Sequence, residues 1–486
     1  MSALHTFYIV FFLLLALLVG FICLDRFKLQ ENSKRRQFLD KLAIACSIAF
    51  VVLSFVDIFM PDGFSTRYVD NVELMLENRN VFHAVLRLFN MAMVAVLPFA
   101  VVYKNKYLIK VLGYTLLPMT LVSCICFWQY LEYFQSVHAQ CPFGEALRPF
   151  LTNGYFRGGL FGALNLLALG TGLYTVLWNT DKLKFAKVSE FFIFLPVFFG
   201  CLFINMPISF PQMFFGTFLP EYGFGMGTMA HLAWIGYIIV GGIFLYLVFR
   251  NKSREDKYTL LLMMSISLLF QYNSFFRSDG IITVARMPFQ LCNIAAVFYI
   301  ITLLTKSEKM YHAVLVMNFV GAVIAIVLCD STYFDGKPAG IFYCMNIHYA
   351  VEHTKVALIP VLMGSLKFFK PLKKSDIKHT LIGFTLYFLS VLAIGVVCNG
   401  LVTKLQDSYF TCNFFFMFDK VAATRLVGDV VGFLFDIKIT FAEYYTLTLA
   451  QLFVYFVFVL VCIGFFYLFY AFFGEKKKKV ARENAE

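Results

Sequence analysis

One cysteine and one histidine in this sequence are candidates for nucleophilic chemistry. Cys292 lies in RMPFQLCNIAAVF, where Gln290 and Asn293 place two amides within one helical turn of it. His353 lies further along, in CMNIHYAVEHTKVALIP. A thiol becomes a strong nucleophile when a base takes its proton, and amide donors can stabilise the oxyanion that forms from a carbonyl substrate. The pattern therefore predicts Cys292 as nucleophile and His353 as base.

Each of these residues also has a simpler interpretation. A cysteine in a membrane segment usually behaves as a small, inert apolar side chain. His353 can simply bond a neighbouring carbonyl, and the two amides can simply bond another helix. The polar groups predicted to bind substrate beside the pair are Gln290, Asn293, Asp330, His348 and Arg286.

The other cysteines indicate no further chemistry. The chain has 12 cysteines, without a CxxC pair or a His/Cys spacing typical of a metal site. We therefore expect no metal and no cofactor. Three cysteines in predicted outer loops leave a disulfide open as an alternative: Cys141, Cys344 and Cys412.

The positions of these residues depend on the membrane, because the composition is that of a polytopic membrane protein. Of 486 residues, 60% are hydrophobic and 14% charged, and the mean hydropathy is +0.76. Apolar stretches long enough to cross a hydrocarbon core of about 30 Å recur along the whole chain. We predict an all-α fold with thirteen spans, at 6–24, 42–60, 82–102, 111–129, 158–178, 189–209, 229–249, 258–275, 287–304, 312–329, 350–366, 380–401 and 446–473.

The basic residues predict the orientation of these spans. Alternate loops, beginning with 25–41, and the C-terminal tail hold 28 of the 41 Lys and Arg residues. By the positive-inside rule these segments are cytoplasmic, so the N-terminus is outside and the C-terminus inside the cell membrane. The net charge of +12 is then a topology signal, and we expect no nucleic-acid partner. A span entered from outside near Pro288 would place Cys292 roughly 7–8 Å deep, level with His353.

Two segments indicate an internal repeat. RLFNMAMVAVLPFAVVYKNK begins at Arg87, 199 residues before RMPFQLCNIAAVFYIITLLTK begins at Arg286. A duplication would give two degenerate six-helix units in parallel orientation plus one extra N-terminal helix, although two Phe- and Leu-rich spans can also align by chance. Met93 stands where the second copy has Cys292. The predicted domains are 1–41 (first helix and basic loop), 42–250 (non-catalytic unit), 251–475 (Cys/His unit) and 476–486 (basic tail).

Both polar segments resemble motifs of a known family. MPFQLCNIAAV and YAVEHTKVALIPVLMG are similar to the YwaF family of bacterial membrane proteins and its animal relative, transmembrane protein 164, a phospholipid-remodelling acyltransferase. The resemblance covers about residues 255–475, and Met287 departs from the usual Leu of the motif. The positions that carry it are Pro288, Gln290, Leu291, Cys292 and Asn293 in the first segment, Tyr349, His353 and Pro360 in the second, and Asp330 between them.

The resemblance implies an acyltransferase in the lipid bilayer. Cys292 would attack an ester carbonyl of a membrane phospholipid, the acyl donor, with His353 as base and later as acid. The resulting thioester would pass its acyl chain to a lysolipid or to a lipoprotein at the outer leaflet. The sequence leaves the oligomeric state open.

Two other classes of protein remain as alternatives. A transporter of a small solute or lipid fits two parallel six-helix halves, but the spans hold few charges and the polar residues lie near one face instead of at mid-depth. A membrane scaffold without catalytic activity fits the Phe-rich spans and leaves the Cys292 cluster without a role.

Overall fold

A computed structural model describes most of the chain. Its helices form two compact units. The first comprises Met1–Gly223, Ile266–Ile282 and Thr332–His348, and the second Phe224–Ser265, Thr283–Ser331 and Tyr349–Glu486. The described residues are 3–28, 34–58, 81–126, 154–206, 223–271, 289–329, 333–334, 337–338, 340–341, 344–406, 410–420, 430–441 and 443–475.

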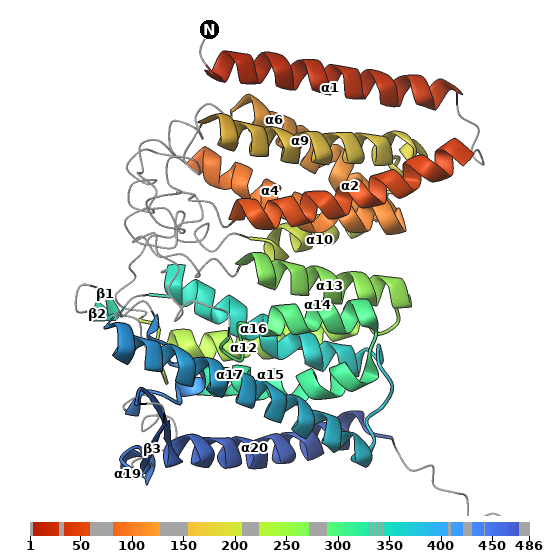
Figure 1. Ribbon diagram of the computed structural model, residues 1–486. Coiled ribbons are helices and arrows are strands. Elements are labelled where there is room, and N and C mark those ends of the chain that lie inside the picture. Colours follow the sequence, from red (N-terminus) through yellow and green to blue (C-terminus); the bar gives the residue numbers. More distant parts are fainter. Residues whose placement is uncertain are drawn as a thin grey trace, which may run out of the picture. The chain divides into compact units, whose positions relative to one another are not determined.

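The first unit is built from helices that pack side by side (Figure 1). Helix α9 is its centre, because it contacts α1, α2, α4 and α6. A π-helical turn, η2, separates α5 from α6. The elements are α1 (Ala3–Lys28), α2 (Lys34–Ile58), α4 (Val81–Tyr103), α5 (Lys106–Val111), η2 (Leu112–Leu116), α6 (Leu117–Ile125), α9 (Gly154–Leu177), η3 (Thr180–Lys182), α10 (Val188–Ile204) and the short strands β1 (Tyr333–Phe334) and β2 (Lys337–Pro338).

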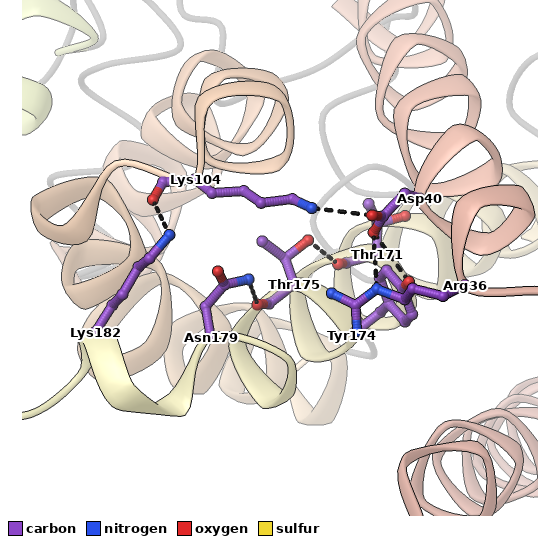
Figure 2. A network of polar contacts seen from close by, with 8 residues as sticks. All are labelled: Arg36, Asp40, Lys104, Thr171, Tyr174, Thr175, Asn179 and Lys182. Carbon is purple, nitrogen blue, oxygen red and sulfur yellow. Dashed lines mark hydrogen bonds and ion pairs between the residues drawn. The ribbon is translucent and has the colours of Figure 1, made fainter. Parts of the chain in front are cut away.

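A polar network joins α2, α4 and α9 in this unit (Figure 2). The Asp40 carboxylate accepts hydrogen bonds from Lys104 Nζ at 3.0 Å and from the Tyr174 hydroxyl at 3.0 Å, and Arg36 Nε lies 3.4 Å from it. The Arg36 guanidinium stacks 3.8 Å over the Trp178 ring. Because both carboxylate oxygens have cationic or hydroxyl partners, Asp40 is a structural residue that ties three helices together.

The second unit contains the two polar segments identified in the sequence. Helix α15 packs against α14, α17 and α20, and α17 also packs against α20. Its elements are α12 (Met229–Phe249), α13 (Arg254–Gln271), α14 (Ala295–Thr305), α15 (Glu308–Val327), α16 (Cys344–Ser365), η7 (Lys374–Asp376), α17 (Ile377–Leu405), η9 (Phe414–Phe416), α19 (Val430–Leu434), β3 (Lys438–Phe441), β4 (Tyr445–Thr448) and α20 (Leu449–Phe473). The end of α13, from Ile266, and the start of α16, up to His348, belong to the first unit.

Local sequence explains how α14, α15 and α17 are held close together. Lys306 ends α14 in the left-handed conformation, with φ 52°, and Ser307 begins α15 by accepting a hydrogen bond from the Met310 amide at 3.3 Å. This short connection makes α14 and α15 an antiparallel pair. Between α15 and α17, Gly383 faces Ala313, and a Cβ on Gly383 would lie only 2.6 Å from the Ala313 Cβ. Glycine is therefore needed for this close approach.

The helices agree with the predicted membrane segments in position. Every predicted span overlaps a helix, and seven helical stretches of the described chain are long and apolar enough to cross a membrane. Large apolar side chains along α12 and α20, such as Val240 and Phe472, are exposed, as lipid-facing residues are. The chain is therefore a multi-pass membrane protein, while thirteen crossings and an internal repeat stay predictions. The seven stretches are Lys34–Ser54, Lys106–Ile125, Gly159–Leu177, Met229–Phe249, Glu308–Val327, Lys374–Leu405 and Leu449–Phe473.

Two details differ from the predicted all-α chain of spans. Small antiparallel sheets pair β1 with β2 and β3 with β4, and the second sheet occupies most of the stretch just before α20. In the described part of the span predicted at 287–304, the α-helix begins at Ala295. Residues 289–294 form turns and a bend, so Cys292 lies in irregular backbone instead of a continuous helix, and its depth stays a prediction.

Candidate functional site

Cys292 lies in a turn, and two backbone carbonyls just before it are held by side chains of other helices. The Tyr387 hydroxyl on α17 donates a hydrogen bond to the Phe289 carbonyl at 2.8 Å. The Asn318 amide on α15, which is fully buried, donates to the Leu291 carbonyl at 2.7 Å. An irregular backbone within a membrane protein needs such partners, because its carbonyls lack the bonds that a helix would provide. Side chains of α15 and α17 therefore fix the backbone that presents Cys292.

Gln290 connects the same turn to a third segment of the chain, around η9. Its Nε2 donates to the Asn413 carbonyl at 3.0 Å, and its Oε1 accepts from the Phe415 amide at 2.9 Å. Phe415 has φ 57°, a conformation that a bulky residue adopts only where the surroundings impose it. The Gln290 amide, predicted to bind substrate, thus bonds the backbone at Asn413 and Phe415 and connects the Cys292 turn to η9.

The Cys292 thiol is half-buried among polar side chains. Its sulfur lies 3.5 Å from Asn293 Oδ1. The Glu352 carboxyl on α16 and the hydroxyls of Tyr299 and Tyr387 are near enough to interact with the sulfur electrostatically. Cys292 is therefore within electrostatic range of side chains on α14, α16 and α17.

His353 is buried on α16, and its hydrogen bond defines its tautomer. The ring nitrogen Nδ1 lies 2.6 Å from the Tyr349 carbonyl oxygen, one helical turn earlier. A carbonyl can only accept, so Nδ1 carries a proton and the lone pair of the neutral imidazole is on Nε2. The Tyr349 ring packs 4.3 Å from the imidazole, and its hydroxyl donates to the Ala325 carbonyl at 2.5 Å. The His353 ring is thus held by the Tyr349 carbonyl and the Tyr349 ring.

A hydrogen bond ties α14 to α16 beside both residues. The buried Tyr299 hydroxyl donates to the Val356 carbonyl at 2.8 Å. Tyr299 follows Cys292 by about two helical turns, and Val356 follows His353 by about one. This hydrogen bond therefore connects the helix that follows Cys292 with the helix that carries His353.

The remaining predicted site residues are distributed differently. Asn293 is in the Cys292 turn, and His348 is half-buried in the first turns of α16, in the part of that helix assigned to the first unit. Arg286 and Asp330 lie outside the described residues. Cys412 is a buried free thiol, so no disulfide forms at this position.

Sequence reasoning missed three side chains around the sulfur. Glu352 directly precedes His353. An acidic residue within an apolar helix is a functional candidate, so the sequence could have indicated Glu352. Tyr299 and Tyr387 are two of 26 tyrosines, and no local pattern distinguishes them. Their place beside Cys292 comes from the packing of α14 and α17.

The second unit also contains a cavity of about 1280 Å³, at the opposite end of α14 from Cys292. Its walls are apolar, with Ile238 and Leu358 among them, and its rim includes Arg254 and Lys370. The length of α14 places about 16 Å between Cys292, just before this helix, and the cavity at its far end. The cavity is therefore separate from the Cys292 turn.

Comparison with known families gives a match for the half of the chain that carries these residues. Residues 224–470 match the TMEM164 family. The chain belongs to the TMEM164 family. The expected resemblance over about 255–475 is thereby confirmed, and the match begins one helix earlier, where the second compact unit also begins. Comparisons with curated proteins and with solved structures found no match.

The TMEM164 family region includes every described part of the candidate site. Cys292, His353, Glu352 and the three side chains that hold the turn all lie within residues 224–470. The Asp40 network of the first unit lies outside this region. The candidate chemistry and the family region therefore belong to the same compact unit.

Proposed function

We propose that this TMEM164 family protein is an acyltransferase that moves a fatty acyl chain from a membrane phospholipid through a thioester on Cys292. The observation that supports the proposal is a thiol on a turn whose backbone is held by side chains of α15 and α17, in the same compact unit as a histidine whose Nδ1 bonds the Tyr349 carbonyl. Acyl transfer through cysteine needs such a nucleophile and a base with a defined lone pair.

The first half-reaction forms the acyl-enzyme. His353 Nε2 takes the thiol proton as the Cys292 sulfur attacks the ester carbonyl, and a new C–S bond forms. The ester C–O bond then breaks, and the imidazolium returns its proton to the departing lysophospholipid hydroxyl. Asn293 is placed to contact the reacting centre, since its side chain already approaches the sulfur. A site buried in the membrane protects the thioester from water.

The second half-reaction reverses the order of these steps with an acceptor. His353 Nε2 removes a proton from the hydroxyl of a lysolipid, or from the amine of a lipoprotein, as that group attacks the thioester carbonyl. The C–S bond breaks, and the sulfur recovers the proton from His353. The same two residues thus serve as nucleophile and as acid–base catalyst in both directions.

Trapping the acyl-enzyme tests the proposal. Purified protein is incubated with phospholipid carrying a labelled acyl chain and no acceptor, and the label on the protein is measured before and after hydroxylamine, which cleaves thioesters. We expect a hydroxylamine-labile label in the wild type and in Cys462→Ala, whose thiol is buried in α20, and none in Cys292→Ala. An equal label in Cys292→Ala would exclude this mechanism, and absence of label from every form would favour the transporter alternative.

We also propose that the N-terminus is outside and the C-terminus is cytoplasmic. This orientation places the Cys292 turn near the outer leaflet and the Lys-rich connections inside. Lys438 in β3 and Lys373 before η7 are exposed and belong to opposite predicted sides. In intact cells, an impermeant thiol reagent should label Lys438→Cys and leave Lys373→Cys unlabelled. The reverse pattern would overturn the orientation.

A further inference from the structure

Two histidines and an aspartate meet at the Lys-rich end of the second unit. His312 is in the second turn of α15, Asp376 ends η7, and His379 is in the first turn of α17. The packing of α15 against α17 brings them together, and the Thr380 hydroxyl bonds the His312 carbonyl at 2.7 Å. The cluster is thus built by two helices that run side by side.

The three side chains direct potential ligand atoms at one another. His312 Nδ1 lies 3.6 Å from Asp376 Oδ2, and His379 Nδ1 lies 3.9 Å from Asp376 Oδ1. One ligand atom from each residue falls within 4.8 Å of the others. Ligand atoms around a tetrahedral zinc ion are about 3.3 Å apart, as bonds of about 2.0–2.1 Å require. Small side-chain rotations would therefore bring the three onto a common ion.

The histidines have bonding capacity that the described protein does not use. His312 is 6% exposed, and neither of its ring nitrogens has a hydrogen-bond partner among the described residues; the same holds for His379 Nδ1. Leaving a buried polar atom unbonded costs about 1–3 kcal/mol. By contrast, the buried His231 donates from Nε2 to the Ile326 carbonyl at 2.7 Å and accepts from the Gly227 amide at 3.0 Å. His231 shows how this fold satisfies a structural histidine.

Ion pairing alone does not account for the cluster. The nitrogen–oxygen separations in the cluster, 3.6 and 3.9 Å, are too long for hydrogen bonds, so both imidazoles keep ring nitrogens without partners among the described residues. A cation that accepts the imidazole lone pairs and the carboxylate would supply those partners. The Lys373 amide donates to Asp376 Oδ2 at 2.8 Å and so orients the carboxylate, as residues behind metal ligands do.

We propose that His312, Asp376 and His379 bind a divalent transition-metal ion of the zinc class. Two imidazoles and one carboxylate suit such ions, and three protein ligands leave a further position open. Glu308 lies one turn before His312 on the same face of α15 and within electrostatic range of it, so it can fill that position or accept from the second imidazole nitrogen. The nearby Lys373 and Lys378 are exposed and can turn toward solvent.

The ion would clamp the two helices that support the Cys292 turn. Helix α15 carries Asn318 and α17 carries Tyr387, and these are the side chains that hold the carbonyls of Leu291 and Phe289. The metal site lies about two turns from each of them. It is a positioning element, and the inference that it binds metal is independent of the proposed acyl transfer.

Metal titration of the purified full chain tests the site. The protein is stripped with a chelator, and Co²⁺ is added as a spectroscopic substitute for Zn²⁺. We expect visible bands of a nitrogen- and oxygen-ligated ion at one equivalent per chain, without the sulfur charge-transfer band of a cysteine site. Zn²⁺ should compete and raise the thermal unfolding temperature.

Variants identify the ligands. His379→Ala and Asp376→Asn should weaken binding by at least about tenfold, since even residues behind metal ligands contribute that much, and should unfold at a temperature that Zn²⁺ no longer changes. Asp256→Asn, which alters an exposed carboxylate at the start of α13, should bind as the wild type does. Because His379 is only partly buried, its variant should fold, and this is checked by its helical circular dichroism. Unchanged Co²⁺ spectra in both ligand variants, or a folded wild type that binds no Co²⁺, would overturn the proposal.

Discussion

Each unit of this protein places an aspartate at the Lys-rich ends of its helices, and the two have different partners. In the first unit, Lys104, Tyr174 and Arg36 surround the Asp40 carboxylate (Figure 2). In the second, Asp376 faces two histidines whose ring nitrogens largely lack hydrogen bonds. The Asp40 carboxylate has hydrogen-bond or ionic partners on both oxygens, whereas the histidines beside Asp376 keep ring nitrogens without hydrogen bonds to other described residues.

The two units also differ at the segments proposed to form an internal repeat, which begin at Arg87 and Arg286. Met93 in α4 is buried, as are the apolar residues Ala92 and Val94 on either side of it in sequence. Cys292, at the paired position, is half-buried beside amide, carboxyl and hydroxyl groups. The comparison teaches that a polar residue becomes a candidate for chemistry when its neighbours leave it a lone pair or a reactive atom. By this criterion the second unit, which contains Cys292 and His353, is the one to which we assign the proposed chemistry.

The largest expected effect is the loss of the nucleophile. Cys292→Ala should reduce acyl transfer by about a thousandfold or more, because no other group can form the thioester. Met93→Leu, a volume-conserving change at the paired position of the first unit, should leave turnover near that of the wild type. Turnover is measured with labelled phospholipid and lysolipid. Equal losses in both variants would remove the functional contrast between the units.

Loss of the base should have the next largest effect. His353→Gln should lower turnover by about 10²–10⁴-fold, the usual contribution of a positioned general base, without changing the amount of folded protein. His231→Gln is the matched change at a histidine with both nitrogens bonded. It should lower the unfolding temperature and keep turnover per folded molecule. A catalytic defect in His231→Gln as severe as that of His353→Gln would contradict the assigned roles.

Loosening the turn should have a smaller effect. Gln290→Ala leaves the Asn413 carbonyl and the Phe415 amide without their partner, which should cost about 1–3 kcal/mol of unfolding free energy. Turnover should fall by about tenfold, because the turn that presents Cys292 becomes mobile. Thermal unfolding and the steady-state assay measure the two effects. Wild-type values in both would show that Gln290 does not hold the turn.

The smallest effect on turnover is expected at Asp40. Asp40→Asn weakens its bonds with Lys104 and Arg36 and should cost about 1 kcal/mol of stability, with turnover per folded molecule unchanged. Differential scanning fluorimetry and the same lipid assay provide the two readings. A turnover defect in the folded variant would give the first unit a part in catalysis and break the comparison.

The sequence alone determined the membrane class, the positions of the helices and the family. Hydrophobic runs and basic loops are local properties, and every predicted span overlaps a helix for that reason. Cys292 and His353 were identifiable as candidates because each is a reactive side chain in an apolar setting, and both lie within the residues that match the family.

Tertiary structure decided what these residues touch. The turn before α14, the bonds of Gln290 to the Asn413–Phe415 loop and the approach of Glu352 to the sulfur all depend on how separate helices pack. His312 and His379 are far apart in sequence, and their spacing predicts no metal ligands. They meet because α15 and α17 lie side by side, at the distance that Gly383 permits. Such convergence is a property of helix packing, which periodicity along one segment does not encode.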